Sequence, residues 1–120
     1  MTIAQKASEL TTESRTYRIA AIPADGIGPE VIAAGLQALE ALARRDGTFR
    51  FDVTEFDWGS GRYKRTGALM PEDGPEQLRA FDAIFFGAVG APDVPDHITL
   101  WGLRLPICQG FDQYANVRPT

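Results

Sequence analysis

Two arginines near the C-terminal end of the chain lie in apolar surroundings. Arg104 lies within the stretch WGLRLPI, and Arg118 follows the stretch YANV. An unpaired buried charge is too costly to keep, so each guanidinium must pair with an acid or line a cleft. The forked donors of a guanidinium match the two oxygens of a carboxylate. The two arginines therefore predict either structural salt bridges or a binding site for a carboxylate ligand.

The other reactive side chains form no standard catalytic arrangement. His97 is the single histidine, and its position beside Asp96 in a proline-rich stretch indicates a surface residue. Cys108 is the single cysteine, for which an apolar filler is favoured over a nucleophile. Asp93 and Asp96 stand beside prolines and are typical of solvated loop acids rather than metal ligands. No metal site is predicted in this span.

A glycine turn between an apolar run and a helix start dominates the N-terminal half. Residues 19–22 have the length of a fully buried strand. The turn PADGIG then leads to Pro29, near the first helical position, where a missing N–H costs nothing. Open α/β folds bind small ligands at such junctions, although the glycines could serve only to turn the backbone. Val31 stands where the dinucleotide fingerprint has its third glycine, so ordinary pyrophosphate binding is not predicted.

The elements that must position these residues alternate between helix and strand. Residues 29–45 carry apolar side chains at helical spacing, with Gly35 tolerable only where another element packs closely. Residues 49–54 alternate as in an edge strand, and residues 82–90 form a second buried apolar run. This order predicts an α/β fold of three layers with a mostly parallel sheet.

Shorter helices are expected between and after the strands. One lies around residues 61–66, and another follows the helix-start residues of PEDGP. The stretch 98–109 allows a helix interrupted at Pro106, and residues 111–120 favour an extended segment.

Composition excludes several classes of protein. Of the 120 residues 44% are hydrophobic and the net charge is −4, without a basic stripe, so nucleic acid is not an expected partner. The basic residues Arg62, Lys64 and Arg65 favour a solvated surface over an anion site. No apolar run approaches the roughly 18–20 residues that cross a bilayer, so no membrane is expected. A lone cysteine fits a reducing cytoplasm.

The two ends of the sequence carry separate expectations. Residues 1–16 are polar, lack the apolar core of a secretory signal and predict a disordered leader. The remaining residues, 17–120, offer three strands and too few helices to cover a parallel sheet on both faces. We therefore expect the N-terminal part of a larger protein, with an incomplete fold.

Three stretches resemble a known enzyme family. They are PADGIGPEV, FDAIFFGAVGAPDVPDH and LWGLRLPICQGFDQYANVRP. The first is similar to the isopropylmalate–isocitrate dehydrogenase family of β-decarboxylating oxidoreductases, and the other two resemble its tartrate and D-malate dehydrogenase branch. The resemblance covers residues 17–120. It implies an isopropylmalate dehydrogenase-like fold, of which this chain supplies the N-terminal part of the dehydrogenase domain.

The resemblance also implies an activity and its cofactors. The expected reaction is NAD-dependent oxidation of a 2-hydroxy dicarboxylic acid such as tartrate or D-malate, which loss of CO₂ can follow. Mg²⁺ or Mn²⁺ would act as Lewis acid. Ile27, Gly87 and Gly90 match cofactor-binding positions, and Arg118 matches an arginine that binds a substrate carboxylate. The family's catalytic residues and metal-binding aspartates come later in its sequence, and its homodimers share active-site residues, so this chain alone is not expected to turn over substrate.

One position departs from the family pattern. Many relatives carry a second carboxylate-binding arginine ten residues before the position of Arg118, where this chain has Cys108. Arg104 lies four residues earlier, on the same helical face, and we expect it to substitute in part and change substrate preference. The choice among tartrate, D-malate and isopropylmalate stays open. The alternative function is a short non-catalytic product that only associates with full-length subunits.

Overall fold

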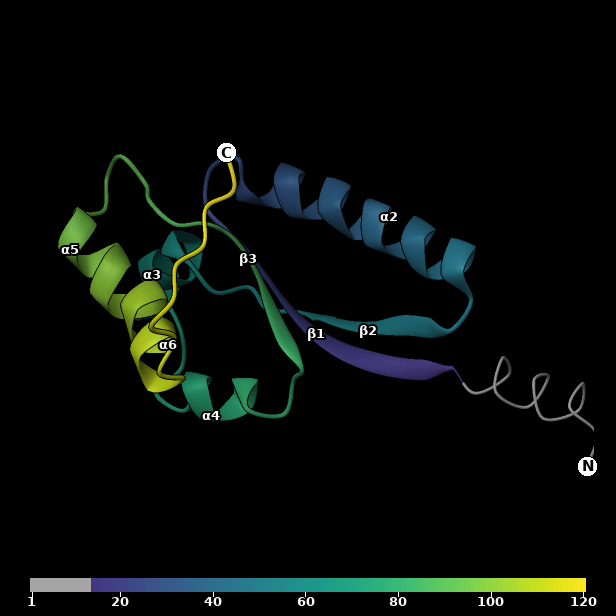
Figure 1. Ribbon diagram of the computed structural model, residues 1–120. Coiled ribbons are helices and arrows are strands. Elements are labelled where there is room, and N and C mark those ends of the chain that lie inside the picture. The colour runs from purple at the N-terminus through teal and green to yellow at the C-terminus, as the bar shows by residue number, and fades with distance from the viewer. Residues whose placement is uncertain (1–13) are drawn as a thin grey trace, which may run out of the picture.

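The computed structural model describes residues 14–120, which form three layers with a sheet in the middle (Figure 1). The elements, in chain order, are β1 (Arg15–Ala24), α2 (Gly28–Asp46), β2 (Phe49–Glu55), α3 (Ser60–Thr66), α4 (Gly74–Leu78), β3 (Ala83–Ala88), α5 (Asp96–Thr99), the π-helix η1 (Leu100–Arg104) and α6 (Leu105–Gly110). Most of the expected leader lies outside the described residues. Its last two residues, 15 and 16, begin β1, so the strand starts earlier than predicted.

The sheet has three parallel strands in the order β2-β1-β3. The run predicted as a buried strand, residues 19–22, forms the centre of β1 and is 0–7% exposed. β2 is an edge strand with half-buried and exposed side chains alternating at its start, as predicted. The prediction of a second buried strand is wrong for the described residues, because β3 lies at the opposite edge with one neighbouring strand. Ala83 is exposed, and residues 84–88 are half-buried.

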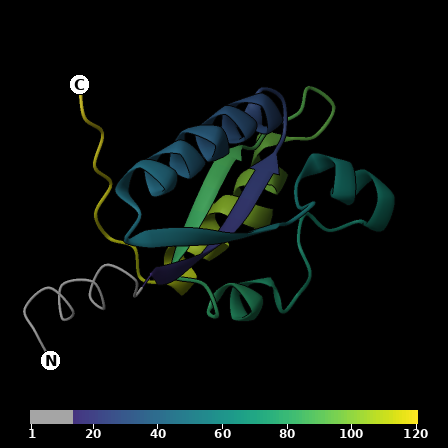
Figure 2. The same ribbon diagram turned by 90° about the vertical axis from the view of Figure 1, so that its right-hand side faces the viewer.

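Helix α2 covers one face of the sheet, as Figure 2 shows. Pro29 lies in its first turn, and Gly47 ends it in the left-handed conformation with φ +80°. A Cβ at Gly35 would lie 2.5 Å from the Phe85 ring of β3. The glycine therefore allows the close approach of another element that its mid-helix position predicts.

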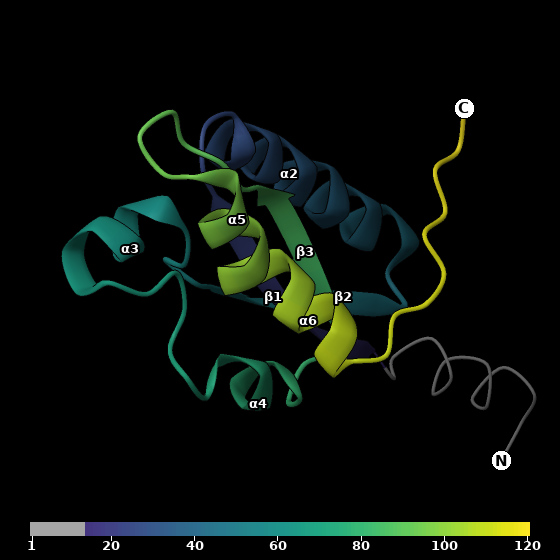
Figure 3. The same ribbon diagram turned by 90° about the vertical axis from the view of Figure 1, so that its left-hand side faces the viewer.

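The opposite face is covered by a continuous helical segment made of α5, η1 and α6 (Figure 3). The expected interruption at Pro106 does not occur. Proline lacks the N–H for a bond four residues back and its ring crowds that carbonyl. The helix instead widens into a π-turn just before Pro106, in which the Leu105 N–H donates to the Leu100 carbonyl. This segment packs its Leu103 and Ile107 into the core with Ala20 and Ile22 of β1.

These two coverings confirm the three-layer α/β fold with a parallel sheet. Residues 111 and 112 form a turn after α6 instead of the expected extended segment, and residues 113–120 continue without regular secondary structure or pairing to the sheet. All residues from Asp112 onward are exposed. Within residues 14–120, no helix combines the length and the apolar character needed to cross a membrane.

Candidate functional site

The turn after β1 lies at the carboxyl edge of the sheet, where parallel sheets bind ligands. It packs backbone against backbone on the end of β3. A Cβ at Gly28 would lie 1.9 Å from the Pro23 carbonyl oxygen, and one at Gly87 would lie 2.2 Å from the same oxygen. The Asp25 N–H also donates to the Ala88 carbonyl at 2.6 Å. Gly28 and Gly87 therefore allow the close fit of this turn to β3.

Ile27 is an exposed apolar residue of this turn, with 63% of its surface accessible. The α-carbons of Gly26 and Gly90 face open space, since a Cβ on either would meet no atom within 4 Å. Both glycines have positive φ, +57° and +147°, which L side chains rarely adopt. Each of these three residues is therefore accessible from solvent.

The Asp25 carboxylate holds this edge together. Its Oδ1 accepts the Ser60 N–H at 2.8 Å, and its Oδ2 accepts the Ser60 hydroxyl at 2.5 Å and the Gly90 N–H at 2.9 Å. The sequence pattern assigns no such role to Asp25. Ser60 lies 35 positions away, and no spacing rule connects the two. A serine directly after a glycine at a helix start was the one available signal.

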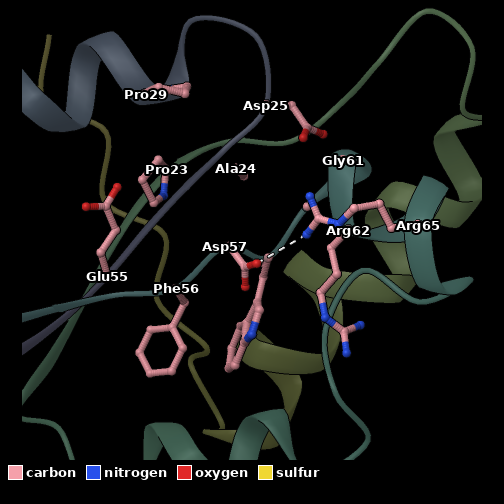
Figure 4. A pocket seen from close by; sticks show the side chains of 12 residues that line it. Pro23, Ala24, Asp25, Pro29, Glu55, Phe56, Asp57, Gly61, Arg62 and Arg65 are labelled. Carbon is pink, nitrogen blue, oxygen red and sulfur yellow. Dashed lines mark hydrogen bonds and ion pairs between the residues drawn. The ribbon is translucent and has the colours of Figure 1, made fainter.

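A cavity of about 460 Å³ opens beside Asp25 at the carboxyl ends of β1 and β2 (Figure 4). Its basic side chains already have partners. Arg65 pairs with Asp57 at 3.2 Å, drawn as the dashed line in Figure 4, and the Arg62 guanidinium donates to the Ala68 carbonyl at 2.7 Å. Lys64 pairs with Asp93 at 2.7 Å. These contacts favour the solvated surface over an anion site, as the sequence indicated.

A second hollow lies on the face of the sheet that η1 and α6 cover, around Arg104 and Cys108. A cavity of about 170 Å³ is lined by these two residues with Ile84, Phe86, Ile107 and Gln113. A neighbouring cavity of about 380 Å³ shares Arg104, Cys108 and Gln113 and continues along residues 115–117. Arg104 is half-buried, and none of the ion pairs among residues 14–120 involves it. Of the two predicted roles, the structure therefore favours the lining of a cavity over a structural salt bridge.

Arg118 lies in the exposed C-terminal segment, where its Nε donates to the Asn116 side-chain oxygen at 3.4 Å. The C-terminal end overlaps the β1–α2 turn in Figure 1, but the turned views in Figures 2 and 3 separate the two. Within residues 14–120, the cavities described above include neither Ile27 nor Arg118. The structure thus groups Arg104 with Cys108, and it joins Gly90 to Asp25, two residues before Ile27, but it does not bring Arg118 to either place.

The remaining acids and the histidine lie at the surface. His97 is exposed in the first turn of α5. The hydrogen bond from Lys64 and that from the Asp93 backbone lower the pKa of the exposed Asp93 carboxyl below its usual value. Within the described part of the chain, no three His, Cys, Asp or Glu side chains are grouped to hold a metal ion.

A parallel sheet with helices on both faces and a glycine turn at the carboxyl end of its central strand define an α/β protein of the class in which ligands commonly bind at that edge. Comparison with known proteins gives the particular family. The family model described as isocitrate/isopropylmalate dehydrogenase matches residues 18–120. The chain belongs to the isocitrate/isopropylmalate dehydrogenase family.

Two of the similar proteins are named for their action on tartrate and on D-malate. The chain is 78% identical over 106 residues to the probable tartrate dehydrogenase/decarboxylase TtuC' of Agrobacterium vitis, covering 88% of this chain and 30% of that protein. It is 53% identical over 108 residues to the decarboxylating D-malate dehydrogenase of Escherichia coli strain K12, with coverages of 88% and 30%. The chain therefore spans about a third of the length of these relatives.

A solved structure shows the same fold. The crystal structure of an apo β-decarboxylating dehydrogenase from Thermococcus kodakarensis matches with a TM-score of 0.61 and 34% sequence identity. The match covers 82% of this chain and 27% of that structure. The sheet and helices described here therefore correspond to part of a larger fold.

Proposed function

We propose that this chain is the N-terminal part of an enzyme that oxidises a 2-hydroxy dicarboxylic acid, tartrate or D-malate, with NAD as the hydride acceptor. Loss of CO₂ can follow the oxidation. The observation that carries the proposal is the 78% identity to a tartrate dehydrogenase/decarboxylase over 88% of the chain. The 53% identity to a D-malate dehydrogenase supports the same substrate class.

The carboxyl edge of the sheet is suited to one part of the cofactor. Ile27 offers an exposed apolar side chain, and the bare α-carbons of Gly26 and Gly90 leave room beside it. These residues fit a flat nicotinamide ring better than they fit phosphates, since no basic side chain lies in the turn. When bound, NAD would accept the hydride from the substrate. In the proposal Ile27 and Gly90 orient and shield the ring, and Gly87 contributes by letting the turn that carries Ile27 pack closely on β3.

Substrate carboxylates are assigned to the arginines. The half-buried Arg104 would bind one carboxylate of the diacid in the hollow that it shares with Cys108. A bidentate guanidinium distinguishes a second carboxylate from a neutral group because its donors would otherwise lose their partner. Arg118 is proposed to bind the other carboxylate, which requires its segment to take a different position in the complete protein.

The described residues contain no group of three His, Cys, Asp or Glu side chains that could hold the proposed Mg²⁺ or Mn²⁺. No step of the reaction is assigned to an ion held by this part of the chain. In the proposal, the metal ligands and the catalytic residues lie in the remainder of the enzyme. The complete enzyme forms a homodimer and acts in the cytoplasm.

The proposal is tested with the complete enzyme of which this chain is proposed to be the N-terminal part. We call it the native-length protein. We expect NADH formation from D-malate or tartrate in the presence of Mn²⁺, and loss of that activity with a chelator. Absence of NADH formation from either diacid would contradict the proposed function. Activity that survives complete removal of divalent cations would contradict the metal requirement.

The lack of a metal cluster in the described residues favours a second candidate for the chain as it stands. As a non-catalytic product it would only associate with full-length subunits. Co-purification of the 120-residue chain with the full-length protein, without added activity, supports this candidate.

A further inference from the structure

Asp25 lies at the candidate cofactor site, yet its carboxylate is already used by the protein. Each oxygen accepts at least one hydrogen bond, and the three donors are the Ser60 N–H, the Ser60 hydroxyl and the Gly90 N–H. Bonds to an ionised carboxylate are stronger than those between neutral groups. A carboxylate held by three donors is poorly available to a ligand, so Asp25 is suited to positioning and not to binding.

Asp25 and its two partners together occupy the connections that follow all three strands. Asp25 follows β1, Ser60 begins α3 after β2, and Gly90 follows β3. The Asp25 N–H adds a bond to the Ala88 carbonyl at 2.6 Å. One residue therefore links the three segments that make up the ligand edge of the sheet.

The surroundings of Asp25 are shaped to accept this carboxylate. Ala24 has a φ of +60°, a left-handed conformation that is costly for a residue with a Cβ. A Cβ at Gly59, which has a φ of +141°, would lie 2.8 Å from Asp25 Oδ1. Ser60 is only 3% exposed although it is polar. Strained backbone of this kind persists where the surrounding contacts fix it, and it is frequent at functional sites.

We propose that Asp25 is a positioning residue for the dinucleotide site. It fixes the turn that carries Ile27 relative to the segment that carries Gly90, so that the two form one surface for the flat ring of the cofactor. This inference rests on the proposed function. It concerns cofactor affinity in particular, because the Arg104 hollow lies on different elements and shares no lining residue with the Asp25 cavity.

Asp25→Asn is an informative substitution because asparagine has the size of aspartate and differs only in its charge and its hydrogen-bonding groups. A carboxylate can accept all three donors, whereas an amide has one accepting oxygen and one NH₂. In either orientation the NH₂ of Asp25→Asn faces a backbone N–H, that of Ser60 or that of Gly90. We expect the edge to open at that point while the core stays packed.

The experiment uses the native-length protein and measures steady-state kinetics with NAD and D-malate, together with amide hydrogen exchange at Gly90. Asp25→Asn is expected to raise the KM for NAD about ten-fold or more, equal to the loss of one strong hydrogen bond. The kcat at saturating NAD and the KM for D-malate should stay within about two-fold, and exchange at Gly90 should accelerate. Ser60→Ala removes one donor of three and should give a smaller rise, of about three-fold.

Glu30→Gln is the matched control, since it removes one carboxylate from the exposed first turn of α2 and leaves the Asp25 bonds intact. Its KM for NAD should stay within about two-fold of the wild type. An unchanged KM for NAD in both Asp25→Asn and Ser60→Ala, with faster exchange at Gly90, would overturn the inference and make Asp25 structural only. An equal rise of both KM values would also overturn it. If Asp25→Asn fails to fold, Ser60→Ala decides alone.

The wild type separates this inference from the proposed function. A wild-type protein that binds NAD without turnover contradicts the proposed function, and the Kd for NAD by calorimetry then replaces the KM in every comparison. A wild-type protein that does not bind NAD contradicts both. A wild type that turns over, with variants that bind NAD normally, contradicts the inference alone.

Discussion

At the scale of single residues, Arg104 and Cys108 are candidate site residues that helical spacing alone predicts to lie side by side. They are four residues apart, and the structure places both on the wall of the same hollow. In the native-length protein, Arg104→Ala should raise the KM for D-malate or tartrate about 10–100-fold, because a charge-assisted bond to the substrate is lost. Arg62→Ala, which removes a half-buried arginine bonded to the Ala68 carbonyl, is the control and should leave this KM unchanged. An unchanged KM in Arg104→Ala would remove Arg104 from the substrate site.

The ion pair between Lys64 and Asp93 gives a prediction on pH. The Lys64 hydrogen bond is the largest cause of the lowered pKa of Asp93. A lowered pKa in the folded state stabilises the protein above the ordinary pKa of the carboxyl, and this contribution is lost as the pH falls through the folded-state value. Both side chains are largely exposed, so the effect on stability should be small and should fade at high salt. An NMR titration should show the pKa of Asp93 rising in Lys64→Ala; the same pKa in both proteins would contradict the assignment.

Individual residues differ in how far the sequence could place them. The neighbourhood of Arg104 and Cys108 follows from helical spacing alone. The bonds from Asp25 to Ser60 and Gly90 join positions 35 and 65 residues apart, and they depend on how the strands are ordered in the sheet. Local pattern carries no information about such contacts.

At the scale of elements, the contact between α2 and β3 should be sensitive to the addition of one methyl group at Gly35. A Cβ at Gly35 would lie 2.5 Å from Phe85, closer than real Cβ contacts come. Alanine favours a helix over glycine by about 1 kcal/mol. Overpacking costs about 1–3 kcal/mol, so we expect Gly35→Ala to be neutral to destabilising by up to about 2 kcal/mol.

Urea unfolding of the native-length protein measures this difference. Phe85→Leu should make room for the new methyl group, so Gly35→Ala should be better tolerated in the Phe85→Leu background than in the wild type. Ala41→Gly, at an exposed position of α2, reports helix propensity alone and should cost about 1 kcal/mol. A clear gain in stability from Gly35→Ala in the wild-type background would contradict the close contact.

The elements also show where local pattern is insufficient. The sequence predicts the helices and strands, but it gives no sign of the π-turn that carries the helix past Pro106. Gly102 in the same turn packs closely on Leu69, since a Cβ there would lie 2.3 Å from Leu69 Cδ1, and such a contact between distant positions is not visible in a local pattern. Likewise the apolar run of β3 predicts a buried strand, although the sheet ends there.

At the scale of the whole molecule, the parallel sheet and the layers follow from the alternation of apolar runs and helices, but the strand order β2-β1-β3 does not. The relation between the two halves of the predicted site does not follow from it either. Ile27 lies on the turn after β1, and Arg118 lies in the exposed C-terminal segment, where its described hydrogen bond is local. The chain spans about a third of its relatives, so the contacts that would hold this segment are to be sought in the complete protein.

The most direct test compares NADH formation by the 120-residue chain with that by the longest product of the same gene, under identical conditions with D-malate or tartrate, NAD and Mn²⁺. We predict turnover by the longer product and none by the 120-residue chain, because the metal ligands are not among the described residues. Failure of the longer product to form NADH from either diacid would contradict the account, as would equal turnover by the 120-residue chain.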